Sequence, residues 1–237
     1  MTRVLITRAQ PQADATAKLV KARGFQPLVF PLTQTEALDD GVREVEAFGG
    51  NVDGIMVATS ARAIEVLEGA GIGPWIGRQR WVVVGSRAAE RLTKLGANLI
   101  LPAARDVAGL IEGLKSRLEP LTYLAGADRK QTLEATFPAM RVIPVYQAKA
   151  LGGFSAEALR HFSVEPPAFA LVYSYRGAHL LSQAIRDAAI EDASLQAKMN
   201  AMQWLCLSQD VAVEAPPEAI VRIADAPTQE TLLQLLA

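Results

Sequence analysis

The sequence predicts an α/β protein with two similar parallel-sheet domains, one of them discontinuous, joined by a two-stranded β linker. Short β-branched runs alternate with amphipathic helical stretches along most of the chain, a pattern typical of βαβ units whose sheet is covered on both faces. The 237 residues suit two domains of roughly 100 to 120 residues each. Half of the residues are hydrophobic, which is enough to fill two cores.

Ten strands are expected, and most of them are followed by a helix. The strands are Val4–Thr7, Pro27–Phe30, Gly54–Thr59, Trp81–Gly85, Asn98–Leu101, Leu121–Ala125, Arg141–Val145, Phe169–Tyr173, Gln203–Leu207 and Ile220–Ile223. The helical period is clear in SRAAERLTKLG, from Ser86, where Ala88, Leu92 and Leu95 share one face. Gly96 is the expected end of this helix.

Features of the first half recur in the second half at a nearly constant distance. A strand followed by Ser, Arg and a helix occurs in GIMVATSARAIEVL, from Gly54, and again in FALVYSYRGAHLL, from Phe169. Three matching pairs lie 114, 123 and 122 residues apart, namely Ser60 and Ser174, Trp81 and Trp204, and the expected helix N-caps Asp106 and Thr228. This spacing indicates two like domains rather than a solenoid, whose repeats are ~20 to 50 residues long.

The expected domain division places the N-terminal unit with the C-terminal half. The strand, helix and strand from Val4 to Phe30 match the region Tyr123–Val145 better than any segment near residue 150. We therefore expect residues 1–34 and 150–237 to form one domain and residues 38–146 to form the other. The crossings, PLTQTEAL at about 31–38 and IPVYQAKAL at about 143–151, are extended in character and can pair as a two-stranded hinge.

Charge and cysteine content exclude several kinds of partner. Lys and Arg number 24 against 25 Asp and Glu, so the chain has no excess of positive charge for a nucleic-acid backbone. The longest apolar runs are far shorter than the ~20 residues of a membrane span, and the N-terminus lacks the pattern of a secretory signal. The single cysteine, Cys206, is expected in the core. We therefore expect a cytoplasmic protein that binds neither nucleic acid nor membranes.

The usual catalytic and metal-binding motifs are absent from the sequence. It contains no GxxxxGK[ST], HExxH, CxxC, GxSxG or calcium-loop pattern. GAGIG, from Gly69 to Gly73, follows a helix rather than a strand, so it is expected to be a helix end and loop and not a dinucleotide-binding motif. His161 and His179 have no carboxylate or thiol at ligand spacing, so no metal site is expected.

Small and hydroxyl residues recur where the expected strands end, which is where open α/β sheets bind ligands. They are Thr7, Thr59, Ser60, Gly85, Ser86, Gly126, Ser174 and Ser208. Each is expected to leave the first N–H groups of the next helix uncovered, as in an anion site. Arginines lie nearby although the helix dipole disfavours them there, namely Arg8, Arg62, Arg87, Arg129 and Arg176. Packing of the aliphatic stem explains any one arginine alone, but the set predicts a large polyanionic ligand.

The motifs and their order resemble those of the uroporphyrinogen-III synthase family, which closes a linear tetrapyrrole into a ring. The resemblance spans the whole chain and rests on VLITRA, ATSARAIEVL, VVVGSRAAERLTKLG, VIPVYQA, VYSYRGAHLL and APTQETLLQLL. Each motif is weakly specific by itself, whereas their order and spacing are more specific. The family's fold is two flavodoxin-like α/β domains joined by a two-stranded ladder, with the N-terminal segment in the discontinuous domain.

The resemblance implies a cyclising lyase of tetrapyrrole and heme biosynthesis. Its substrate is hydroxymethylbilane, a flexible chain of four pyrroles with eight carboxylates. Loss of the terminal hydroxyl as water gives an azafulvene, and closure through a spiro intermediate inverts the last ring to give uroporphyrinogen III. Because the substrate can close without help to the uninverted isomer, the protein's main task is to orient the reacting ends. The resemblance implies no metal or organic cofactor, and a monomer with at most transient contact to the preceding pathway enzyme.

The resemblance also implies roles for individual residues. Tyr146 corresponds to the tyrosine of the family's V-Y element, and its phenol is expected to assist departure of the hydroxyl, although packing alone is an equal alternative. The expected substrate contacts are Arg8, Thr59, Ser60, Gly85, Ser86, Arg87, Gly126, Arg129, Ser174, Arg176 and Ser208.

Two positions depart from the family's pattern. Ala88 stands where the family has a threonine, and LSQDVA replaces a G-P-x-T turn, with Ser208 for the glycine and Val211 for the threonine. Two hydroxyl contacts are thereby lost, for which Ser86 and Ser208 are candidate substitutes. A divergent or inactive member of the family is therefore an open alternative.

Two further hypotheses of other classes stay open. A two-domain protein could close on a polyanionic or sugar-phosphate ligand without transforming it, and Tyr146→Phe would then change no rate. A response-regulator or flavodoxin-like signalling pair is less well supported, because the sequence has no acidic cluster after the first strand and no hydroxyl-rich flavin loop.

Overall fold

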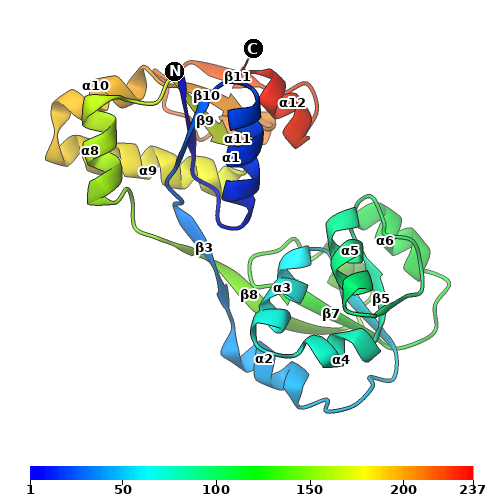
Figure 1. The fold of residues 1–237 in the computed structure, drawn as a ribbon. Coiled ribbons are helices and arrows are strands. Elements are labelled where there is room, and N and C mark those ends of the chain that lie inside the picture. Colours follow the sequence, from blue (N-terminus) through cyan, green and yellow to red (C-terminus); the bar gives the residue numbers. More distant parts are fainter. Residues whose placement is uncertain (237) are drawn as a thin grey trace. The chain divides into compact units, whose positions relative to one another are not determined.

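The computed structural model describes residues 1–236, apart from the side chains of Glu191 and Ala193, and the chain divides into two compact units. Unit 1 consists of Met1–Gln34 and Lys149–Ala237, and unit 2 consists of Thr35–Ala148. Figure 1 shows each unit as a sheet with helices packed on it, unit 1 in dark blue and yellow to red, unit 2 mainly in light blue, cyan and green. The predicted α/β class with parallel sheets is confirmed.

Unit 1 contains a five-stranded parallel sheet in the order β11-β10-β9-β1-β2. Its strands are β1 (Arg3–Ile6), β2 (Gln26–Val29), β9 (Phe169–Val172), β10 (Gln203–Cys206) and β11 (Val221–Ile223). Its helices are α1 (Gln12–Ala22), α8 (Ala156–Val164), α9 (Tyr175–Glu191), α10 (Ala193–Asn200), α11 (Gln209–Ala212) and α12 (Gln229–Gln234). Leu5 belongs to the core shared with α8 to α11, whereas Val4 and Ile6 belong to the core shared with α1 and α12. This alternation is the two-residue period of a strand buried on both faces.

Unit 2 contains a six-stranded sheet in the order β3-β8-β7-β4-β5-β6. Its strands are β3 (Thr33–Ala37), β4 (Ile55–Ala58), β5 (Arg80–Val83), β6 (Asn98–Leu99), β7 (Leu121–Gly126) and β8 (Arg141–Ala150). Its helices are α2 (Asp39–Glu46), α3 (Ala61–Gly69), α4 (Gly73–Arg78), α5 (Ser86–Lys94), α6 (Val107–Leu114) and α7 (Thr132–Thr136). One core joins the sheet to α2, α3, α4 and α5, and the other joins it to α6 and α7.

The expected linker segments form β3 and the end of β8, which are neighbours in the sheet. The N–H of Leu38 donates to the carbonyl of Val145 at 3.0 Å, and the N–H of Leu151 donates to the carbonyl of Leu32 at 3.0 Å. Because the residue numbers rise along one segment and fall along the other, the two run antiparallel. Pairing with β3 is the reason that β8 continues to Ala150 instead of ending at Val145 as expected from the sequence.

Most sequence-based helix boundaries are confirmed. Asp106 and Thr228 cap α6 and α12 by accepting backbone N–H groups, and Gly96 follows α5 with a φ of 78°. GAGIG is the end of α3 and the short loop before α4, with Gly71 at a φ of 83°. Among residues 1–236, no helix has the length and apolar character needed to cross a membrane.

Candidate functional site

Several predicted site residues of unit 2 meet at the carboxyl ends of three adjacent strands. Thr59 follows β4, Gly126 ends β7, and Tyr146 lies in β8, and these strands are neighbours in the order β8-β7-β4. Gly85, with Ser86 after it, follows β5 on the other side of β4. Parallel pairing therefore gathers at one sheet edge residues that are far apart in the sequence.

A β-bulge places Tyr146 over Gly126. Ala125 pairs with Pro144, but the register then shifts so that Gly126 lies opposite Tyr146 instead of Val145. Side chains alternate between the faces of a strand, so an unshifted register would direct Tyr146 to the other face. A Cβ on Gly126 would lie 2.9 Å from Cζ and 3.0 Å from Oη of Tyr146. Gly126 thus provides the space that the phenol ring occupies.

A second tyrosine, Tyr123 of β7, lies under this edge of the sheet. Its side chain is only 3% exposed, and its Oη lies 2.7 Å from Oγ1 of Thr59. Burial raises the pKa of the Tyr123 phenol, the hydrogen bond with Thr59 opposes this rise, and the nearby Tyr146 and Glu134 add to it. The Tyr123 phenol is therefore neutral at physiological pH.

Two predicted site arginines of unit 2 bind carboxylates of the chain itself. Arg129 donates from Nε to Glu134 at 2.6 Å and from a terminal nitrogen to the carbonyl of Gly126 at 3.1 Å. Arg87 of α5 pairs with Glu65 of α3 at 2.6 Å. In this structure acidic partners at i+5 and on the neighbouring helix pair with the two arginines, so a contact with an external anion would have to replace these ion pairs and stays a prediction.

The helix starts also differ from expectation. The Ser60 hydroxyl accepts the N–H of Arg62 at 3.2 Å, and the Ser174 hydroxyl accepts the N–H of Gly177 at 3.1 Å. These side chains cap the amides that were expected to be open, as serine commonly does at an N-cap. Of the helices that begin at predicted site residues, α5 and α11 start without a side-chain cap, at Gly85 and Ser208.

Predicted residues of unit 1 form a separate group at the carboxyl ends of β1, β9 and β10. The guanidinium of Arg8 lies 4.0 Å from the ring centroid of Tyr173. It also donates to Thr16 of α1 and Gln229 of α12, each at 3.3 Å. Arg8 therefore connects α1 and α12 to the end of the sheet.

The remaining predicted residues of unit 1 are more accessible. Ser174 and Arg176 are exposed, and Ser208 is half-buried. The family departures, Ala88 and Val211, are both buried in the hydrophobic cores. An alanine and a valine are suited to those apolar surroundings, where a threonine hydroxyl would need a hydrogen-bond partner.

Sequence reasoning missed Tyr123 and Glu134. The sequence placed Tyr123 inside an expected strand, and nothing in it singled out Glu134. The available signal was the position of Tyr123 three residues before Gly126, near a predicted strand end. Only the pairing of β4 with β7, which places Tyr123 opposite Val57, shows that its phenol can reach Thr59.

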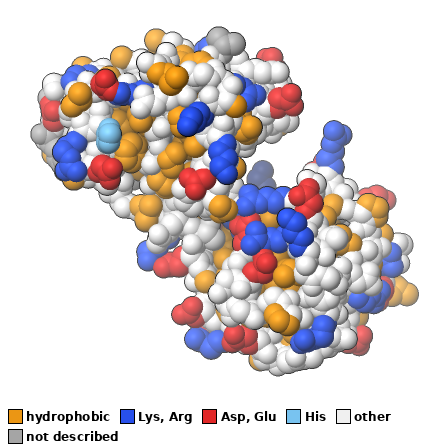
Figure 2. Space-filling view, in the orientation of Figure 1, with side chains coloured by type: hydrophobic (Ala, Val, Ile, Leu, Met, Phe, Trp, Pro, Cys, Tyr) orange, Lys and Arg blue, Asp and Glu red, His pale blue; other side chains and the backbone are white. Residues whose placement is uncertain are grey.

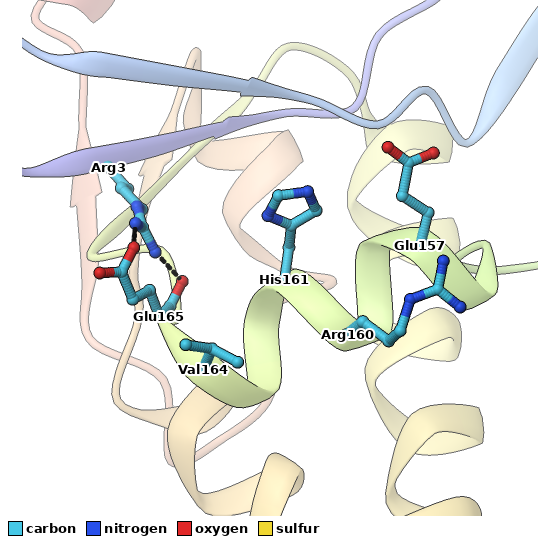
Figure 3. A pocket seen from close by; sticks show the side chains of 6 residues that line it. All are labelled: Arg3, Glu157, Arg160, His161, Val164 and Glu165. Atoms are coloured by element: carbon cyan, nitrogen blue, oxygen red, sulfur yellow. Dashed lines mark hydrogen bonds and ion pairs between the residues drawn. The ribbon is translucent and has the colours of Figure 1, made fainter.

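The surface outside these groups carries mixed charge. On the face seen in Figure 2, Lys and Arg side chains lie among Asp and Glu on each unit. Figure 3 shows a pocket on α8 of unit 1 that is lined by Arg3, Glu157, Arg160, His161, Val164 and Glu165. Arg3 pairs there with Glu165. The residues predicted from the strand ends do not line this pocket.

The chain is similar to known proteins of one family. A sequence model of the family described as uroporphyrinogen-III synthase HemD matches residues 14–234. A crystal structure of mutant uroporphyrinogen III synthase from the extremely thermophilic bacterium Thermus thermophilus is similar, with 18% identity, a TM-score of 0.53 and coverage of 100% of this chain and 96% of that chain. The wild-type enzyme of the same bacterium, in another crystal form, shows 19% identity, a TM-score of 0.44 and the same coverage. No curated protein sequence matches significantly.

Proposed function

The chain belongs to the uroporphyrinogen-III synthase family, and from this premise we propose which of its residues serve the reaction. It is a lyase of tetrapyrrole and heme biosynthesis, and it cyclises hydroxymethylbilane to uroporphyrinogen III with inversion of the last pyrrole ring and loss of water. The family match over residues 14–234 carries this conclusion.

We propose that Tyr146 donates a proton to the departing hydroxyl of the substrate. A phenol is protonated at neutral pH and can stabilise an oxygen that leaves as water. The bulge between Ala125 and Gly126 supports this role, because it holds the half-buried ring over a glycine at the carboxyl edge of the sheet. The ring packs against a core of unit 2 on one side, and the neighbouring strand ends carry the other predicted site residues Thr59 and Gly126.

We further propose that the substrate carboxylates bind to hydroxyl and backbone N–H groups of the predicted residues at the strand ends. Gly85 and the exposed Ser86 begin α5, which has no side-chain cap. The first N–H groups and the dipole at this helix start favour a carboxylate. Arg87 can add charge there by exchanging its partner Glu65 for the substrate, since ion pairs at the surface are weak.

We propose that the protein is a monomer and that it is located in the cytoplasm. The buried free thiol of Cys206 is in keeping with a reducing compartment. Sedimentation of the purified protein tests the monomer, which a concentration-independent mass near 25.4 kDa would support.

Product-isomer analysis tests the role of Tyr146. The wild-type protein should convert hydroxymethylbilane to the type III isomer, whereas Tyr146→Phe should slow this at least about tenfold and raise the share of type I product. The share rises because uncatalysed closure of the substrate gives the uninverted ring. Tyr175→Phe removes an exposed phenol and is the matched control. An unchanged rate of type III formation in Tyr146→Phe would remove the tyrosine from the reaction.

A further inference from the structure

The Tyr123–Thr59 pair is defined by the register of two parallel strands. Tyr123 of β7 lies opposite Val57 of β4, and Thr59 follows Val57 by two residues on the same face. Two residues advance a strand by about 6.6 Å toward its carboxyl end, a distance that a tyrosine side chain spans. The Oη and Oγ1 atoms are 2.7 Å apart, which is the usual separation of a hydroxyl pair.

Either hydroxyl can donate in the hydrogen bond between Tyr123 and Thr59, and the burial of Tyr123 favours its phenol as the donor. The Tyr123 hydroxyl is buried and needs an acceptor for its proton. Within residues 1–236, Thr59 Oγ1 is its hydrogen-bond partner. Buried donors in native proteins are nearly always paired, so the phenol proton points at Thr59. A threonine hydroxyl that accepts this bond keeps its own proton for another acceptor.

Thr59 lies where its hydroxyl can donate a second hydrogen bond to a ligand. It is half-buried, unlike Tyr123, and it stands between the end of β4 and Ser60, the N-cap of α3. The Ser60 hydroxyl accepts the N–H of Arg62 and so caps α3. Thr59 is therefore the hydroxyl at this strand end that is bonded to a buried phenol and takes no part in capping α3.

We propose that Tyr123 is a positioning residue that fixes Thr59 as a hydrogen-bond donor to a carboxylate of the substrate. The proposal rests on the proposed function, since it assigns a role to Tyr123 in binding the linear tetrapyrrole. Tyr123 does not touch the substrate, and its effect passes through the Thr59 hydroxyl. Loss of the hydrogen bond between Tyr123 and Thr59 should weaken substrate binding more than it slows the chemical step.

A double-mutant cycle between positions 123 and 59 tests this. KM and kcat for hydroxymethylbilane, and Kd for uroporphyrinogen III under anaerobic conditions, are measured for Tyr123→Phe, Thr59→Val and the double variant. Each single variant should raise KM and Kd about 3- to 10-fold with kcat changed less than about twofold, the size expected for one hydrogen bond. The double variant should be no worse than Thr59→Val alone.

A conservative variant and a surface control complete the design. Thr59→Ser keeps the hydroxyl and should bind nearly as well as the wild type. Adding Tyr123→Phe to Thr59→Ser should again raise KM and Kd. Thr93→Val removes a hydroxyl from α5 that bonds the Ala89 carbonyl, and it should leave KM and Kd unchanged. Thermal unfolding of each variant checks that the phenylalanine, which fills the same space, keeps unit 2 folded.

Additive losses at the two positions, or unchanged KM and Kd in Tyr123→Phe, would overturn the positioning role. The proposed function is judged separately, because it fails if the wild-type protein forms only the type I isomer. The Kd cycle requires no turnover, so it still decides the role of Tyr123 in that case.

Discussion

Gly126 shows that a glycine can be required for space and not for its backbone angles. Gly126 does not have a positive φ, yet a Cβ at this position would lie only 2.9 Å from Cζ of the Tyr146 ring. Gly96 shows the opposite case. It has a φ of 78°, and a Cβ at this position would meet no atom within 4 Å. At the residue scale, the position of the proposed proton donor therefore depends on a hydrogen atom in place of a methyl group.

Gly126→Ala should displace the Tyr146 ring and slow formation of uroporphyrinogen III about 10- to 100-fold, the cost of misplacing a reacting group by a fraction of an ångström to an ångström. Steady-state rates and product isomers measure the effect. Gly69→Ala, at the end of α3 where a Cβ meets nothing within 4 Å, is the matched control and should keep full activity. Equal activity of the two variants would show that the ring has room to move.

Cys206 should be unreactive in the native protein. Its side chain is fully buried, and burial raises the pKa of the thiol to about 11, because the thiolate is poorly solvated in the core. At pH 8 a disulfide reagent should therefore label the protein only after denaturation, and labelling of the native state should stay slow as the pH rises toward 10. Ser116→Cys adds an exposed thiol that should react at once. Rapid labelling of native wild-type protein would contradict the burial.

At the scale of elements, charged side chains form ion pairs between neighbouring helices. Arg87 and Arg91 of α5 pair with Glu65 and Glu68 of α3, with the residues spaced by one helical turn on each helix. Surface pairs of this kind contribute little to stability, so they can open when a stronger anion arrives. The sequence shows the arginines of α5, but it does not show which carboxylates of the neighbouring helix face them.

A buried glutamine fixes the segment that precedes β4. Gln79 is 2% exposed, its Oε1 accepts the N–H of Val52 at 2.8 Å, and its Nε2 donates to the carbonyls of Trp75 and Gly50 at 3.0 and 3.3 Å. Replacing it with an apolar residue leaves buried backbone groups without partners, which costs about 1–3 kcal/mol for each such group.

Gln79→Leu should therefore lower the free energy of unfolding by about 2–3 kcal/mol, whereas Gln183→Leu, at an exposed position, should change it by less than about 0.5 kcal/mol. Urea unfolding followed by tryptophan fluorescence measures both, since Trp75 and Trp81 lie in a core of unit 2 and Trp204 lies in a core of unit 1. A small loss in Gln79→Leu would mean that water replaces the amide.

At the scale of the whole molecule, each unit has its own cores. The two clusters of unit 1 and the two of unit 2 draw their buried residues from one unit only. Because unit 2 is continuous in sequence and its sheet is complete from β3 to β8, its packing does not require the rest of the chain.

A fragment of residues 33–150 should accordingly fold by itself. We expect a single cooperative urea transition with tryptophan fluorescence, near-native circular dichroism and no formation of uroporphyrinogen III. The N-terminal fragment of residues 1–34 is the control and should be unfolded, because its strands β1 and β2 lack β9. A non-cooperative transition of the fragment of residues 33–150 would show that unit 2 depends on unit 1.

The sequence by itself determined the α/β class, the ten expected strands and the strand ends at which the predicted site residues lie. Apolar runs of strand length, helix caps such as Asp106 and Thr228, and glycines such as Gly96 act locally, so their effects can be read from neighbouring residues. The resemblance to a family, based on motif order, was confirmed by the match to residues 14–234.

Only the tertiary structure decided which polar groups are open to a ligand and which are already paired. The bulge that turns Tyr146 over Gly126, the reach of Tyr123 to Thr59 and the pairing of Arg87 with Glu65 all join residues of different strands or helices. The physical reason is that strand register and helix contacts fix these distances, and register depends on how the whole sheet packs.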